Sequence, residues 1–74
     1  MITDKQLDER AKELTDKRYS WWRGFHIATR AALEVDRESL RLMQDEVVFI
    51  EDEGVLLEWS AHITTLRKRL GLNT

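Results

Sequence analysis

The chain has 74 residues with no cysteine and no proline, so it forms one domain at most and depends on neither disulfides nor a zinc-thiolate centre. Charged residues make up 35% and hydrophobic residues 42%, a composition that excludes a wholly disordered chain. Twelve Lys and Arg against fourteen Asp and Glu give a net charge of -2, which excludes a broadly polycationic nucleic-acid binder. We expect a single helical domain over residues 1–74.

Apolar residues in the first half of the chain are spaced alternately by four and three, which predicts one long helix over about 4–34. The stripe consists of Leu7, Ala11, Leu14, Arg18, Trp21, Phe25, Ala28, Ala32 and Val35. Thr3 and Gln6 form a capping box at its start. Gly24 and the aromatic residues before it are poor helix formers, so a kink or break near 19–24 is left open.

A second helix is predicted over about 37–50. Asp36 is a suitable N-cap for it, because Val35 before the cap and Leu40 inside the helix would form a hydrophobic staple. A third helix is predicted over about 55–70. Gly71 follows it and can take positive φ, which indicates a Schellman ending.

The second and third helices are separate because their apolar stripes are out of phase. Ile50 and Leu66 are sixteen residues apart, which places them about 160° apart around a straight helix. The predicted break is 51–54, where Gly54 can take an unusual backbone angle. The alternative is an α+β fold with a β-hairpin over 47–59, because Val, Phe, Ile and Trp suit strands.

The resulting all-α helical bundle would cover only the second half of the long first helix. Leu7, Ala11 and Leu14 would then lack a cover, and a domain of this size is often marginal as a monomer. We therefore expect a homodimer in which the first helices pair through these residues in a coiled-coil seam. The alternative is a monomer in which the third helix runs on and covers the amino-terminal half.

Basic and aromatic residues alternate between 17 and 30, where no acid occurs. Trp22 lies one position off the apolar stripe, beside Arg18 and Arg23, and an exposed tryptophan among arginines is typical of a protein-binding hot spot. The same mixture could hold phosphates and stack on bases, so a nucleic-acid-binding regulator is the alternative function.

The segment from Leu42 to Leu66 contains six acids and no Lys or Arg, and so carries -6. Glu51, Asp52 and Glu53 are its densest part. These acids can neutralise the basic segment of their own or a partner chain. They can also imitate a phosphate backbone and enter the basic groove of another protein. We therefore count them as candidate partner-binding residues.

The sequence predicts neither catalysis nor a cofactor. Glu58 and His62 share a helix face and His26 could add a third metal ligand, but no His-Glu-x-x-His motif or thiolate supports a metal site. The serines lack a Gly-x-Ser-x-Gly context, and the three glycines are too scattered for a phosphate-binding loop.

The longest aliphatic or aromatic run has four residues, Val47 to Ile50, whereas a helix needs about 20 to span a bilayer. No basic start followed by an apolar stretch marks a signal peptide. We expect a cytoplasmic protein without a membrane partner.

Two segments, Ile2 to Leu7 and Ala28 to Glu34, together with the aromatic cluster between them, resemble the first half of small uncharacterised proteins encoded by bacteriophages and prophages. The resemblance implies a protein that binds and disables, or redirects, one host factor or defence component without catalysis. We therefore expect a non-catalytic protein-binding module that acts as a phage-type inhibitor or regulator. A structural or assembly protein is the second alternative.

Overall fold

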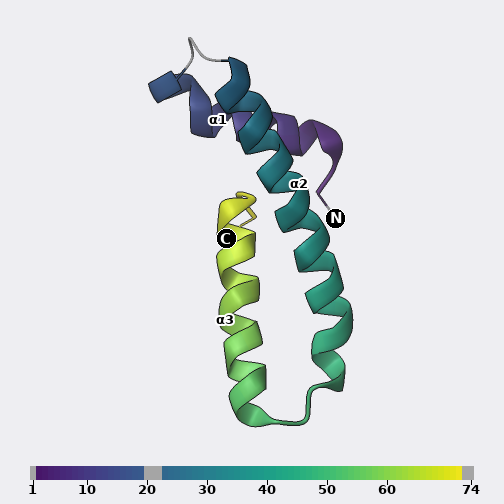
Figure 1. The fold of residues 1–74 in the computed structure, drawn as a ribbon. Helices are drawn as coiled ribbons and strands as arrows, with labels where there is room; N and C mark the ends of the chain where they lie inside the picture. The colour runs from purple at the N-terminus through teal and green to yellow at the C-terminus, as the bar shows by residue number, and fades with distance from the viewer. Residues whose placement is uncertain (1, 20–22, 73–74) are drawn as a thin grey trace. The chain divides into compact units, whose positions relative to one another are not determined.

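The computed structural model describes residues 2–19 and 23–72, and these ranges contain helices and no strand (Figure 1). The helices are α1 (Asp4–Tyr19), α2 (Arg23–Glu46), the 3₁₀ turn η1 (Val47–Phe49) and α3 (Glu53–Arg69). The expected all-α class is confirmed. The chain divides into two compact units, which we call unit 1 (Met1–Val35) and unit 2 (Asp36–Thr74).

The first helix begins as expected but ends earlier. The backbone N–H of Thr3 donates to Oε1 of Gln6 at 2.8 Å, and the N–H of Gln6 donates to Oγ1 of Thr3 at 3.2 Å, which confirms the capping box. The single long helix over 4–34 is wrong, because α1 ends at Tyr19 and α2 begins at Arg23. The separation falls in the region where Gly24 and the aromatic residues weaken helix propensity.

In unit 1, α1 packs against the first half of α2 (Figure 1). The buried residues of this unit are Ile2, Leu7, Ala11, Thr15 and Leu33. Arg30 of α2 adds ionic contacts to α1, since its guanidinium hydrogen-bonds to the Asp8 carboxylate and lies 3.9 Å from Asp4. The hydrogen bond to Asp8 is the main reason that the pKa of Arg30 lies above its ordinary value.

The second helix does not begin at residue 37, because α2 continues through Val35 and Asp36 without interruption. Val35 is exposed, so it forms no hydrophobic staple. Asp36 is not an N-cap either. Its carboxylate is largely buried and lies 3.5 Å from the guanidinium of Arg69 in α3. The helix persists because Val35 and Asp36 are followed by good helix-forming residues and no Gly or Pro interrupts them.

Unit 2 is a helical hairpin in which α3 runs back alongside the second half of α2 (Figure 1). Its buried apolar residues are Leu40, Leu66 and Leu70. A break between the two helices is present, but earlier than the predicted 51–54. The helix α2 ends at Glu46 and not at 50, and the extended backbone angles belong to Ile50 and Asp52. Gly54 does not make this turn. It lies inside α3, and the only positive-φ residue of the described chain is Gly71.

Both ends of α3 are capped. Asp52 is the N-cap, and its side chain accepts a hydrogen bond from the backbone N–H of Val55 at 3.0 Å. At the other end, the N–H of Leu72 donates to the carbonyl of Arg67 at 2.8 Å and the N–H of Gly71 donates to that of Lys68 at 3.1 Å. These two bonds and the φ of 75° at Gly71 confirm the predicted Schellman ending.

Candidate binding surface

Large apolar side chains are exposed on both sides of the connection between η1 and α3. We call this set the loop patch, and it consists of Val48, Phe49, Val55, Leu56 and Leu57. Phe49 and Leu57 are 75% and 72% exposed. Single exposed apolar residues are normal, whereas five within ten positions make this end of the hairpin a candidate site of interaction.

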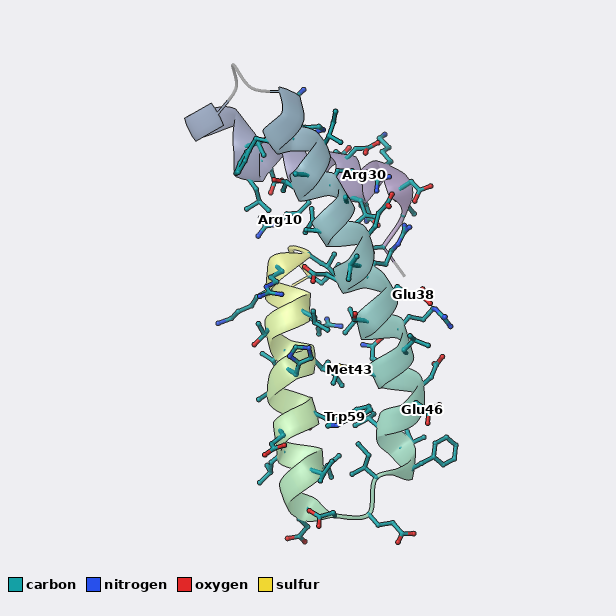
Figure 2. The ribbon with its side chains drawn as sticks, viewed as in Figure 1. Arg10, Arg30, Glu38, Met43, Glu46 and Trp59 are labelled. Atoms are coloured by element: carbon teal, nitrogen blue, oxygen red, sulfur yellow. The ribbon has the colours of Figure 1, made fainter. Side chains whose placement is uncertain are left out.

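The loop patch is exposed because one neighbouring helix cannot cover it. Val55, Leu56 and Leu57 are consecutive, so their side chains spread over about 200° of the helix circumference. The second half of α2 contacts only one side of α3. Along that side Met43 and Trp59 lie between the two helices and are half-buried (Figure 2). The hairpin therefore closes tightly around Leu66 and leaves its loop end partly open.

Acidic side chains surround the loop patch. Glu46, Glu51, Asp52, Glu53 and Glu58 are all exposed, and no Lys or Arg occurs between residues 46 and 58. Five acids and no base give this stretch a charge of -5. One of these carboxylates also has a structural task, because Asp52 caps α3. The surface thus combines apolar contact area with a negative potential.

One backbone hydrogen bond lies on each side of the connection between η1 and α3. The N–H of Ile50 donates to the carbonyl of Val47 at 3.2 Å, and the N–H of Leu56 donates to that of Asp52 at 2.9 Å. No strand edge occurs in residues 2–19 or 23–72. A ligand can therefore be recognised here through side chains and not by strand addition.

Three of the six predicted partner-binding residues, Glu51, Asp52 and Glu53, lie at the loop patch. Trp22 lies outside the described residues, and so do the side chains of Arg18 and Arg23. Phe49 and Leu57 were not among the predicted binding residues. The signal for Leu57 was its position off the apolar stripe of α3, which leaves a large side chain without a partner helix.

The three predicted dimer-interface residues differ in how far the single chain buries them. Leu7 and Ala11 are 0% exposed within the single chain, so the expectation that they need a second chain for cover is wrong. Leu14 is 44% exposed, and Thr15 occupies the buried position in its place. The correction arises because α1 packs against α2, whereas one long helix would have carried these residues beyond any neighbour.

The residues considered for metal binding do not form a site. Glu58 and His62 are exposed on α3, and in the described part of the chain no three His, Cys, Asp or Glu side chains are placed to hold a metal ion. In unit 1, His26 is directed to Thr15, with 3.4 Å between Nδ1 and Oγ1. Among the helices that the structure describes, none has the length and apolar character that crossing a bilayer requires.

Comparisons of the chain with protein-family models, with curated proteins and with solved structures found no match.

Proposed function

We propose that this chain is a non-catalytic protein-binding module that acts by occupying a surface of another protein. The observation that carries the proposal is the loop patch, where Val48, Phe49 and Leu57 are each more than two-thirds exposed. Removal of apolar side chains from water is the dominant favourable contribution to most protein–protein association. The resemblance to small phage proteins supports the narrower role of an inhibitor or regulator of a host or defence protein.

The test compares two serine substitutions of equally exposed apolar residues. Phe49→Ser alters the loop patch in unit 2, and Ile27→Ser, at a side chain that is 67% exposed, alters α2 in unit 1. Both variants should keep the helical circular dichroism of the parent. In pull-downs from bacterial lysate, the wild-type chain and Ile27→Ser should retain a protein that Phe49→Ser loses. The same retained proteins with all three baits would contradict the proposal.

A purified partner then allows the interaction to be measured directly. Calorimetric titration should give a negative heat-capacity change, because apolar area leaves water at the loop patch. The affinity should fall by about tenfold or more for Phe49→Ser and by less than about twofold for Ile27→Ser. Equal losses for both variants would assign the binding to another surface.

We retain the homodimer as a proposal, on the one predicted interface residue that the single chain leaves exposed. Leu14 of α1 is 44% exposed, so a second copy that pairs with α1 would remove its side chain from water. Sedimentation of the wild type and of Leu14→Glu tests this contact, and a monomer mass for the wild type at tens of micromolar would remove it.

A further inference from the structure

We infer that the occupant of the loop patch is a cationic amphipathic helix of another protein. The inference rests on the proposed function, since it names the class of partner for the same surface. It follows from three properties of unit 2: apolar side chains exposed at one end of the hairpin, neighbouring charges of one sign, and no strand in the part of it that the structure describes.

The charge selects a cationic partner. Residues 46–58 carry -5, and all five acids are exposed within a few positions of Phe49 or Leu57. Every one of them is therefore within about a Debye length of the apolar contact, where salt screens charge only in part. Lys and Arg beside the apolar stripe of a partner would be attracted, whereas Asp and Glu would be repelled when the contact forms.

The partner binds through a helix because the described residues offer exposed side chains and no strand that an extended peptide could join. The first turn of α3 is closed by the Leu56 N–H to Asp52 carbonyl bond and by the Asp52 side-chain cap. An extended peptide would find no strand in the described residues to pair with along its length. A helix satisfies its own backbone and presents apolar residues at i, i+3, i+4 and i+7, which can pack beside α2 and α3 as a third helix.

The same charge argues against other occupants. A second copy bound through a two-fold axis would bring an identical patch, and with it a second charge of -5, to the contact. Anionic lipid surfaces and nucleic acid also carry the sign that residues 46–58 repel. A cationic helix is the macromolecular surface that offers apolar area and opposite charge together.

The test uses the full chain and three labelled synthetic peptides of about 18 residues. The first has leucines on one helix face and lysines elsewhere, the second has glutamates in place of the lysines, and the third contains the residues of the first in an order that gives no apolar face. Fluorescence anisotropy at about 50 mM salt should show the first peptide binding at least about tenfold more tightly than either control. Equal binding of the glutamate peptide or of the scrambled peptide would overturn the inference.

Variants of the chain locate the binding. Phe49→Ser should weaken binding of the first peptide by about tenfold, and Ile27→Ser should leave it unchanged. Replacing Glu51 and Glu53 by glutamine should weaken it by about threefold at about 50 mM salt and have no effect at about 500 mM. A peptide affinity that does not respond to Phe49→Ser would place the peptide elsewhere and overturn the inference.

A cross-linking experiment distinguishes an error in the inferred partner class, a cationic helix, from an error in the proposed protein-binding function. A photo-cross-linking residue at position 49 reports any protein that contacts the loop patch in lysate, whatever its charge. Cross-links to a non-helical or acidic segment would overturn the cationic helix and leave the proposed function standing. If neither the peptides nor any cellular protein reach position 49, both are wrong. Cross-links to a helix rich in Lys and Arg, together with the peptide selectivity, support both.

Discussion

Oγ1 of Thr15 in α1 lies 3.4 Å from Nδ1 of His26 in α2, and the same hydroxyl lies 2.8 Å from the carbonyl oxygen of Ala11. A hydroxyl has one proton, so a Thr15 hydroxyl that donates to Ala11 can only accept from His26, in the imidazole tautomer that carries its hydrogen on Nδ1. The hydroxyl is thus hydrogen-bonded to Ala11 while only 1% of Thr15 is exposed. This contact explains how a polar residue can occupy a core position of unit 1.

Replacing Thr15 by valine should lower the unfolding free energy by about 1 kcal/mol, because Nδ1 of His26 loses its buried acceptor. Thr64→Val is the matched control. Thr64 makes the same type of bond, from Oγ1 to the carbonyl of Ser60 at 3.0 Å, but it is exposed, so its replacement should change stability by less than about 0.5 kcal/mol. Urea unfolding measures both, and equal losses would show that the contact with His26 contributes nothing.

The burial of Thr15 shows that the spacing of apolar residues did not fully predict which side chains are buried. The predicted apolar stripe continued from Ala11 to Leu14. In the structure, the buried residues of α1 are Leu7, Ala11 and Thr15. A pattern of apolar residues does not count threonine, whose hydroxyl can be satisfied by the carbonyl four residues earlier. On α2 the difficulty is different. Apolar residues lie on two faces of this helix, and the pattern alone did not show that Leu33 is buried and Val35 exposed.

Sequence signals at the helix ends predicted the structure better than the apolar stripes did. The capping box at Thr3, the break before α3 and the Schellman ending at Gly71 depend on backbone chemistry within a few residues, so the sequence specifies them directly. Of the residues in the candidate site, only the acidic ones were predicted from the sequence. Phe49 stands in the apolar run from Val47 to Ile50 but was not assigned to the buried stripe, and the η1 turn in which it lies was not predicted.

A second prediction compares two leucines of α3 with opposite environments. Leu66 is 2% exposed and Leu57 is 72% exposed. Leu66→Ala should destabilise the protein by about 2–5 kcal/mol, because the substitution leaves a cavity in the hairpin core. Leu57→Ala should change stability by less than about 0.5 kcal/mol. Urea unfolding of both variants provides the check, and a large loss for Leu57→Ala would assign that side chain to packing and remove it from the loop patch.

A third prediction concerns pH. Arg41 hydrogen-bonds to Glu38 with 2.5 Å between Nη2 and Oε1, and this bond is the main reason that the pKa of Glu38 lies below its ordinary value of 4.5. A carboxyl whose pKa is lower in the folded chain stabilises the fold at pH values above 4.5. That contribution declines as the pH falls below 4.5 and is lost once the folded carboxyl is protonated.

The variant that checks this effect is Glu38→Gln. Its unfolding free energy should depend less on pH than that of the wild type between neutral pH and about pH 3. The difference should be small, because both side chains are exposed, and it should shrink further in high salt. Identical pH profiles for the two proteins at low salt would show that the pair with Arg41 adds no stability.

The Schellman ending provides the last prediction. Gly71 has a φ of 75°, which places it in the left-handed region, and its N–H and that of Leu72 hydrogen-bond to the last turn of α3. Gly71→Ala should cost about 1–2 kcal/mol, because Cβ clashes with the following carbonyl in this conformation. Asparagine tolerates it better, so Gly71→Asn should cost less than Gly71→Ala. Thermal unfolding should rank stability as wild type, Asn, then Ala, and an alanine variant at least as stable as the wild type would show that α3 does not need the left-handed ending.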